Sequence, residues 1–398
     1  MKNRPKFIIT IFLVAALMVG LVIAPGMAQA MSKGKVALVS DVGGRGDLSF
    51  NDMSFKGTDK AAADFGLEMV NIQSATAADY LPNVRNAARS RSFDLIIAVG
   101  FLLTDAISTA AKEFPEQKFM IIDSVVEAPN VMSIVFKENE GSALVGALAA
   151  MVAAHYDFPN VGAVLGIEIP VLFHFEAGYR FGIDWGNKMV AKKTGKDAQI
   201  GLLYTYTGTF SDIAKGKEAT QAMLAQKAGL VYNVAGPLGI GDLQAITEAI
   251  KAKGKQAGPP FMIGVDANQD WMGDGHRVLA SMLKRVDNAC YKAVEDVVKG
   301  SFKPGLTVMG LDVQGVAMSR QPELLTFMEF GIGAGKISAA DKAKIVENWK
   351  KMRGQIPAWI WEAVADLEKQ IISGQISVPN ANTLDEMKAV RSKYPLTR

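Results

Sequence analysis

Three aspartates of the sequence each follow a short run of apolar residues with the composition of a buried strand. They are Asp41 after VALVS, Asp123 after FMII and Asp266 after FMIGV. In open α/β sheets ligands bind at the carboxyl ends of the strands, so we expect these carboxylates to line a binding site. Ionised carboxylates accept hydrogen bonds and repel anions, which suits a ligand rich in O–H and N–H donors. Each aspartate on its own could instead be a turn residue or a helix N-cap.

Aromatic and amide side chains lie close to the same strand ends. A glycine-rich turn, Gly43–Gly46, leads into a helix that opens on Phe50 and Asn51. Phe210 lies just beyond the strand-like LLYTYTGT, and Phe175 is a further aromatic candidate. The faces of these rings can stack on a flat ligand.

Two further residues extend this set of candidate ligand contacts. Gly236 follows VYNVA, and Lys284 ends VLASMLK, where its ammonium group could donate to a hydroxyl. A solvated lysine is the alternative interpretation of Lys284. A neutral, hydroxylated and flat molecule fits the whole set, and a nucleoside is the simplest example.

Several motifs that would indicate other chemistry are absent from the sequence. The turn Gly43–Gly46 lacks the GxGxxG spacing, and there is no GxxxxGK[ST] loop for a nucleotide phosphate. His155, His174 and His276 are scattered, with no HExxH, and no GxSxG motif occurs. Cys290 is the only cysteine, and we interpret it as a small buried hydrophobe. We therefore expect no metal, no cofactor and no enzymatic activity.

The first thirty residues have the pattern of a secretory signal peptide. Three basic residues precede the apolar run Phe7–Ala24, and Ala28–Ala30 supplies a small-residue cleavage pattern. The alternative is an uncleaved membrane anchor, because the apolar run is about 18 residues long. No cysteine lies near the leader to carry a lipid, so we expect a protein that is free in the periplasm.

The charge balance excludes nucleic acid as a partner. The 43 basic residues of the chain include three in the leader, so the rest of the chain carries 40 basic against 40 acidic residues. A neutral protein lacks the basic patch that binds nucleic acid.

Short apolar runs alternate with longer amphipathic stretches along the chain, which favours α/β domains built on doubly wound parallel sheets. The predicted strands are Val36–Ser40, Glu68–Ile72, Leu95–Val99, Phe119–Ile122, Val131–Phe136, Val161–Leu165, Ile200–Tyr204, Val231–Val234, Phe261–Val265 and Val278–Lys284, followed by the run Thr307–Ala317. Helical patterns lie between and after these strands, and they include Phe50–Phe65, Tyr80–Arg91, Thr104–Phe114, Gly141–Ala154, Ser211–Ala228, Gly241–Ala252, Asn288–Val298, Asp341–Met352 and Ala358–Gly374.

The order of these elements predicts two lobes joined by several chain crossings. We place the N-terminal lobe at residues 31–136 with 285–305, and the C-terminal lobe at residues 137–284 with 306–398. Residues 1–30 are assigned to the signal peptide.

A series of motifs in the right order resembles the basic membrane protein family. They are VALVSDVGGRGDLSFND, DLIIAVG, FMIID, GIEIPVLFHFEAG, TFSDIAKGK, VAGPLGIGDLQ, GVDANQ and SMLKRVDN, spread over residues 35–320. That family comprises substrate-binding proteins of ABC transporters and is typified by the purine nucleoside receptor. The resemblance implies the periplasmic-binding-protein type I fold, in which two α/β lobes close on a ligand at a hinge, and a permease as the membrane partner.

The resemblance also implies roles for residues of the first lobe. Asp41, Phe50 and Asn51 match ligand-binding positions, with Phe50 stacking on the base. Asp123 matches a carboxylate that forms hydrogen bonds with the base.

In the second lobe the resemblance implies that Asp266 and Lys284 hold the ribose hydroxyls. Gly236 lets the backbone approach the ligand closely, and either Phe175 or Phe210 completes the aromatic sandwich. The chain departs from the family pattern at Asn268 and at Asp270.

We therefore expect a monomeric periplasmic receptor that binds a purine nucleoside of the guanosine, inosine or adenosine type and presents it to an ABC permease. A riboflavin or sugar receptor on the same fold is the alternative. An exported nucleoside hydrolase is a weaker one, because no acid–base pair or metal-binding carboxylate cluster is visible in the sequence.

Overall fold

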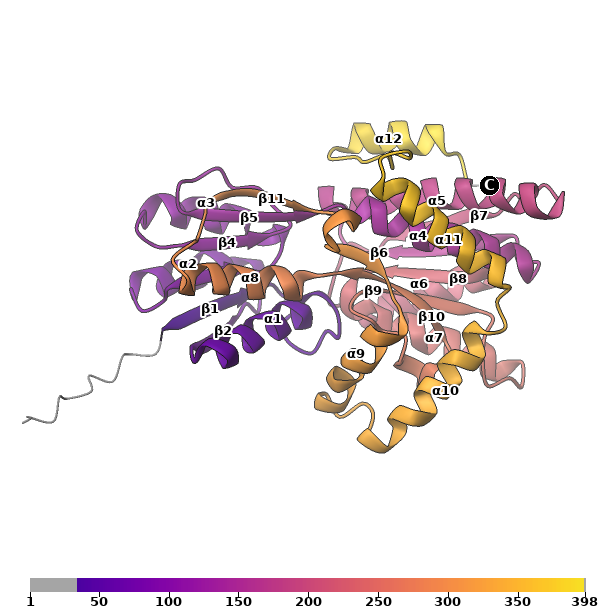
Figure 1. Cartoon of the computed structure of the whole chain (residues 1–398), viewed down its shortest axis with the longest axis horizontal. Coiled ribbons are helices and arrows are strands. Elements are labelled where there is room, and N and C mark those ends of the chain that lie inside the picture. Colours follow the sequence, from indigo (N-terminus) through magenta and orange to yellow (C-terminus); the bar gives the residue numbers. More distant parts are fainter. Residues whose placement is uncertain (1–33, 397–398) are drawn as a thin grey trace, which may run out of the picture. The chain divides into compact units, whose positions relative to one another are not determined.

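The computed structural model describes residues 34–396 of the chain. The predicted signal peptide, residues 1–30, lies outside the described residues. Two sheets with helices on both faces form the framework (Figure 1).

The first sheet has six parallel strands in the order β11-β5-β4-β3-β1-β2. Its two faces bury alternate residues of the central strands, as expected for a parallel sheet covered on both sides. Val36 and Leu38 of β1 belong to the core under α1, whereas Ala37 and Val39 pack with residues of α2 and α3. The strands are β1 (Lys35–Ser40), β2 (Glu68–Gln73), β3 (Leu95–Ala98), β4 (Phe119–Ile122), β5 (Val131–Phe136) and β11 (Gly305–Met309).

The second sheet has the order β12-β10-β9-β8-β6-β7. All of its pairs are parallel except β12 with β10, which are antiparallel. The strands are β6 (Asn160–Leu165), β7 (Gly201–Tyr206), β8 (Ala228–Val234), β9 (Phe261–Asp266), β10 (Val278–Lys284) and β12 (Val316–Met318).

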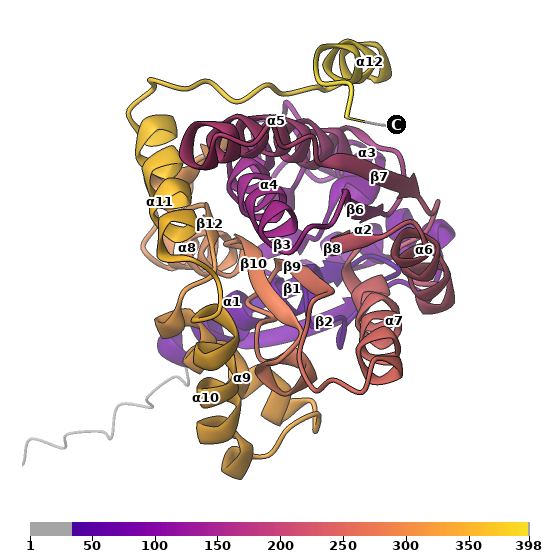
Figure 2. The ribbon, with the colours of Figure 1, turned by 90° about the vertical axis from the view of Figure 1, so that its right-hand side faces the viewer.

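The helices cover the two sheets, and the last of them, α12, lies against α5 (Figure 2). They are α1 (Phe50–Phe65), α2 (Tyr80–Arg89), α3 (Thr104–Glu113), α4 (Glu138–His155), α5 (Pro170–Thr194), α6 (Ile213–Ala225), α7 (Gly239–Ala252), α8 (Val286–Val298), α9 (Gln321–Gly333), α10 (Lys342–Arg353), α11 (Ala358–Ile372) and α12 (Leu384–Lys393).

The predicted α/β class with doubly wound, largely parallel sheets is confirmed, and the predicted strands up to β10 lie within a few residues of the observed ones. The run Thr307–Ala317 was wrongly predicted as one segment. It contains two strands that belong to different sheets, because Gly310 and Gly315 bracket a turn between β11 and β12. The helices named from the sequence did not include α5, α9 or α12.

Helices α4 and α5 cross at very short distance because glycines stand at the contact. A Cβ on Gly178 would lie 2.1 Å from the carbonyl oxygen of Asn139, and one on Gly182 would lie 2.2 Å from that of Ala143. Since no side chain fits there, this spacing of glycines fixes α5 on α4. The contact also fixes the positions of the first residues of both helices, which lie beside the cavity described below.

The chain passes between the two sheets three times, after β5, after β10 and after β11. Strand β11 pairs with β5, so residues 306–309 lie in the first sheet and not, as predicted, with the second lobe. Helix α8 packs against α1, on the side of the first sheet (Figure 1). Residues 34–396 belong to one compact unit, and the exact lobe boundaries stay a prediction.

Cys290 lies fully buried in α8, as predicted. Burial raises the pKa of its thiol to about 12. Among the described residues, no helix is long and apolar enough to cross a membrane.

Candidate ligand-binding site

A cavity opens where the carboxyl ends of strands from both sheets meet. It encloses about 600 Å³ of space not filled by protein atoms, part of it open to solvent. The lining residues are Asp41, Asp47, Phe50, Gly100, Phe101, Leu102, Asp123, Ile169, Val171, Leu172, Phe175, Phe210, Val234, Gly236, Pro237, Val265, Asp266 and Lys284.

All of the residues that the sequence analysis singled out line this cavity, with the exception of Asn51. The Asn51 side chain lies behind the wall, where its Nδ2 donates to Asp41 Oδ1 at 3.0 Å and to Asp47 Oδ2 at 3.2 Å. Its place in the structure is therefore that of a support for Asp41.

The N-terminus of α1 is capped in an unusual way. The carboxylate of Asp47 accepts from the backbone N–H groups of Ser49, Asn51 and Asp52 at 2.8–3.0 Å, and so satisfies the free donors of the first turn. Ser49 occupies the N-cap position, but its hydroxyl makes no capping bond. The Ser49 hydroxyl is thus free to reach the second sheet.

Contacts between the two sheets are made by this hydroxyl and by a glutamine. Ser49 Oγ donates to Asp266 Oδ2 at 2.9 Å and lies 3.1 Å from the carbonyl oxygen of Val265. Gln269 Nε2 donates to the carbonyl oxygen of Leu48 at 3.0 Å. The start of α1 is therefore bonded directly to the end of β9.

Asp123 and Lys284 form an ion pair that also joins the two sheets. Lys284 Nζ lies 2.6 Å from Asp123 Oδ2, and only 1% of the lysine is exposed. The second oxygen, Asp123 Oδ1, is buried and has no hydrogen-bond partner. A buried acceptor without a partner is costly, and this oxygen is free to accept a further hydrogen bond.

Asp123 and Asp266 both have positive φ angles, of 65° and 63°. Each is the residue at the carboxyl end of a strand, and aspartate tolerates the left-handed region better than most residues. Such backbone strain gathers at functional sites. The two sheets therefore present carboxylates to the cavity by the same local geometry.

Aromatic rings lie around Lys284 and along the wall of the cavity. Lys284 Nζ lies 5.1–5.6 Å from the ring centres of Phe50, Phe136 and Phe175, which is within cation–π distance. Phe175 is only 4% exposed, whereas Phe50 and Phe210 are half-buried and offer more of their faces.

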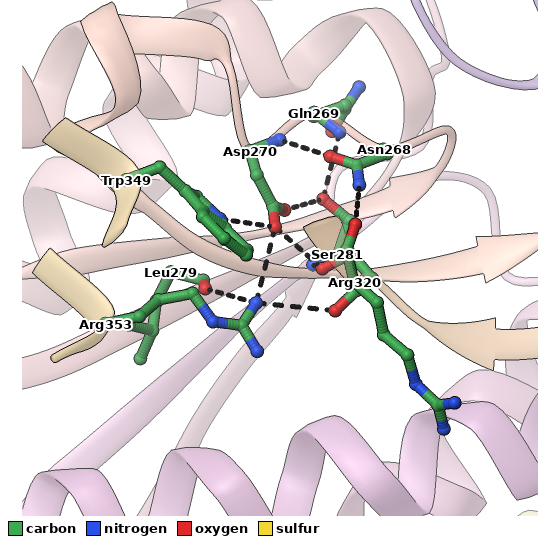
Figure 3. A network of polar contacts seen from close by, with 9 residues as sticks. Asn268, Gln269, Asp270, Leu279, Ser281, Arg320, Trp349 and Arg353 are labelled. Carbon is green, nitrogen blue, oxygen red and sulfur yellow. Dashed lines mark hydrogen bonds and ion pairs between the residues drawn. The ribbon is translucent and has the colours of Figure 1, made fainter. Parts of the chain in front are cut away.

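A network of polar contacts holds the loop after Asp266 in place (Figure 3). Asp270 is fully buried and accepts from Ser281 Oγ at 2.7 Å and from Trp349 Nε1 at 3.0 Å, with Arg353 at 3.5 Å. Asn268 Oδ1 accepts from the Asp270 backbone N–H at 3.1 Å. Of the two departures from the family pattern, Asp270 ties this loop to α10, and Asn268 bonds the backbone of Asp270 and of Arg320.

Burial shifts the protonation of the cavity carboxylates. It raises the pKa of Asp41 and of Asp266, although Asn51 and Lys284 respectively oppose the shift. Burial and the neighbouring Asp52 charge raise the pKa of Asp47 to about 7. The pKa of Asp123 is raised by burial against the pull of Lys284.

The lysine is held in its charged form. Burial acts to lower the pKa of Lys284, but the carboxylates of Asp123, Glu138 and Asp266 outweigh it and raise the pKa. One ammonium faces several carboxylates, so the site accepts neutral, donor-rich ligands and repels anions. Within the described part of the chain, no cluster of His, Cys, Asp and Glu side chains could hold a metal ion.

Sequence reasoning missed several residues of the site. Asp47 directly follows the turn Gly43–Gly46, and its spacing of two to five residues before the N–H groups that it caps in α1 is a capping signal. Phe101 and Leu102 follow Gly100 at a strand end and could have been found by the same rule as Asp41.

Comparisons with known proteins agree with this arrangement. A family model described as ABC transporter substrate-binding protein PnrA-like matches residues 34–334. The chain is 35% identical to an uncharacterized lipoprotein of Pyrococcus furiosus, over 96% of this chain and 95% of that one. It is 30% identical to the ABC transporter nucleoside-binding protein BmpA of Lactococcus lactis, over 87% and 89% of the two chains.

A solved structure is similar over most of this chain. The crystal structure of an ABC transporter solute-binding protein from Aeropyrum pernix superposes with a TM-score of 0.83 and 34% identity, covering 91% of this chain and 97% of that one.

The comparisons overturn the expected localisation. We predicted a protein released into the periplasm without a lipid anchor, because no cysteine lies near the leader. Three relatives from Pyrococcus species, 34–36% identical over at least 90% of this chain, are named lipoproteins, so that prediction was wrong.

The expectation that the chain is not an enzyme is confirmed by the family, whose members bind a solute for a transporter and its permease. The matched region covers the cavity, both sheets and most of the helices around them. The chain belongs to the PnrA-like family of ABC transporter substrate-binding proteins.

Proposed function

We propose that this chain binds a purine nucleoside in the cavity between its two sheets, as a monomer, and presents it to an ABC permease. The observation that carries the proposal is the buried Asp123 Oδ1, an acceptor without a partner in the wall of the cavity.

The polar groups fit the hydrogen-bonding edge of a base and the hydroxyls of a sugar. Asp123 Oδ1 accepts from an N–H of the base, while Asp266 and Asp41 accept from donors on either part of the ligand. Lys284 has three N–H donors and gives one to Asp123 and one to Glu138, which leaves one for a ligand oxygen. No phosphate is expected, since the surrounding carboxylates repel it.

The aromatic walls fit a flat base. Phe50 from the first sheet and Phe210 from the second are half-buried at the cavity, and we propose that the base lies between them. Phe175 is packed deeper, beside the lysine, and forms the floor. The relative from Lactococcus lactis is named nucleoside-binding, which supports this ligand class.

Binding favours the closed arrangement of the two sheets only if the ligand has a higher affinity for that form. Asp123 belongs to one sheet and Asp266 to the other. A ligand that bonds both carboxylates therefore has a higher affinity for the closed form.

The test is calorimetric titration of the purified chain with guanosine, inosine, adenosine, riboflavin and a pentose, together with mass spectrometry of any molecule that co-purifies. We expect a purine nucleoside to bind. Asp123→Ala should weaken it by about 1.5–3 kcal/mol, the range for hydrogen bonds to charged groups.

The matched control is Asp105→Ala, since Asp105 is an exposed aspartate of the same lobe, on α3. Equal losses of affinity in both variants would remove Asp123 from the site. Recovery of a flavin or a sugar would overturn the nucleoside and favour the alternative receptor, and release of free base from a bound nucleoside would indicate hydrolysis.

A further inference from the structure

Glu138 is a buried carboxylate behind the wall of the cavity, where the proposed ligand does not reach it. It is the first residue of α4 and is only 1% exposed. Its Oε1 lies 2.9 Å from Lys284 Nζ, and the same Nζ lies 2.6 Å from Asp123 Oδ2. The ammonium group is therefore shared between one carboxylate at the cavity and one behind it.

His174 contacts the other oxygen of Glu138. Its Nδ1 lies 2.9 Å from Glu138 Oε2, and its Nε2 lies 3.0 Å from Asn382 Oδ1. Both partners are acceptors, so a ring that bonds both carries two N–H groups and a positive charge. Burial acts to lower the pKa of His174, but Glu138 and Asn382 outweigh it and raise the pKa.

Asn382 comes from a C-terminal segment, residues 376–396, that lies beyond the matched family region. This segment lies along α5 (Figure 2). It is tied to α4 by Asn139 Nδ2, which donates to the carbonyl oxygen of Val378 at 3.0 Å, and to α5 by Arg391, which pairs with Glu176 at 2.7 Å. These bonds hold Asn382 next to His174.

We propose that His174 is a positioning residue of the ligand site, and that its imidazolium neutralises Glu138 and so leaves the Lys284 ammonium at the cavity wall beside Asp123. The inference rests on the proposed function, because it takes Lys284 and Asp123 as ligand contacts.

The physical reason is competition between two carboxylates for one ammonium group. The charged groups that act on His174 are Glu138 of α4 and Lys284 of β10, and its contact from the C-terminal segment is the neutral Asn382. Without the imidazolium, Glu138 would have Lys284 as its only cation and would draw it away from Asp123. The ligand would then lose its donor.

The first experiment compares nucleoside affinity in His174→Gln and His155→Gln. His155 is the matched control, since it lies at the far end of α4 and its ring contacts Tyr156. His174→Gln should weaken binding about tenfold, equivalent to one pKa unit of lost interaction, and His155→Gln should leave it unchanged. Equal affinities of the two variants would overturn the proposal.

A double variant separates positioning from a general loss of structure. In Glu138→Gln the charge that His174 neutralises is gone, so adding His174→Gln should cause no further loss of affinity. An equal loss in both backgrounds would contradict the proposal. If His174→Gln does not fold, Asn382→Ala, at an exposed residue, should weaken binding in the same direction and lower the pKa of His174.

A titration of the His174 Cε1–H resonance by NMR tests the proposal without any ligand. The wild-type ring should titrate above pH 6.5, and Glu138→Gln should bring its pKa down. If wild-type protein binds no nucleoside, the proposed function fails, and this titration still decides the present inference. A wild-type pKa at or below 6.5 would overturn it.

Discussion

At the scale of single residues, two glycines set the positions of the two rings that face the cavity. A Cβ on Gly100 would lie 3.2 Å from the Phe50 ring, and a Cβ on Gly166 would lie 2.0 Å from the Phe210 ring. Gly100 also has a φ of 104°, which other residues rarely adopt. Each ring therefore lies against a backbone surface that carries no side chain.

We predict that Gly166→Ala displaces Phe210 and weakens nucleoside binding by about 0.5–1.5 kcal/mol, the range for an aromatic contact. The new methyl group cannot coexist with the ring at its present position. Titration calorimetry measures the loss. Gly333→Ala is the control, since a Cβ there meets nothing within 4 Å, and unchanged affinity in both variants would show that Phe210 does not contact the ligand.

Residues of the cavity could be predicted from the sequence where they stand at the ends of strands. Asp41, Asp123 and Asp266 follow apolar runs, and the rule for parallel sheets brought them to one cavity. Glu138 and His174 stand at the start of helices and meet only because α4 and α5 cross closely. No local pattern in the sequence predicts the contact between Glu138 and His174.

At the scale of elements, the pair α6–α7 contains a buried carboxylate with a single partner. Asp242 of α7 is fully buried, and its Oδ1 accepts from Thr220 of α6 at 2.8 Å. Its Oδ2 has no partner. Burial raises the pKa of Asp242 well above its usual value, so the folded state binds a proton that the unfolded state has released.

This protonation predicts a pH-dependent gain from Asp242→Asn. A folded pKa above the unfolded one means that wild-type stability falls as pH rises above about 3.8, with a limiting slope of about 1.4 kcal/mol per pH unit for one group. Asparagine does not titrate, so the advantage of the variant should grow from pH 4.5 to pH 7.5 in urea unfolding. Glu218→Gln, an exposed change on α6, is the control, and an advantage that is constant with pH would contradict the prediction.

Helix α5 shows why the bounds of a long helix can be hard to read from the sequence. It contains glycines at positions 178, 182 and 186, and glycine lowers helix propensity by about 1 kcal/mol each. Those glycines are required by the contact with α4, which local propensity does not register. The strands, by contrast, were predictable because burial on both faces makes each a continuous apolar run.

At the scale of the whole molecule, we expect the contacts between the sheets to set how readily the proposed site closes. Ser49→Ala removes the hydroxyl that bonds Asp266 and Val265. We expect an affinity loss of about 0.5–1.5 kcal/mol, mainly as faster ligand dissociation, because the closed form loses a bond that the open form lacks. Stopped-flow kinetics measures the association and dissociation rates of the ligand.

Ser54→Ala on the same helix is the control, since the Ser54 hydroxyl bonds the carbonyl oxygen of Phe50 within α1. Equal ligand dissociation rates in the Ser49→Ala and Ser54→Ala variants would show that Ser49 does not hold the sheets together.

The three passages of the chain between the sheets also have a consequence for biosynthesis. Strand β11 completes the edge of the first sheet and α8 packs on α1, yet both follow β10 in the chain. A growing polypeptide that ends before residue 309 therefore lacks part of its first sheet, although domains usually form in order of synthesis. By the time β11 emerges, every strand of the second sheet except β12 has been made. All the residues that line the cavity precede β11, yet the sheet that carries several of them gains its last strand only after they have been made.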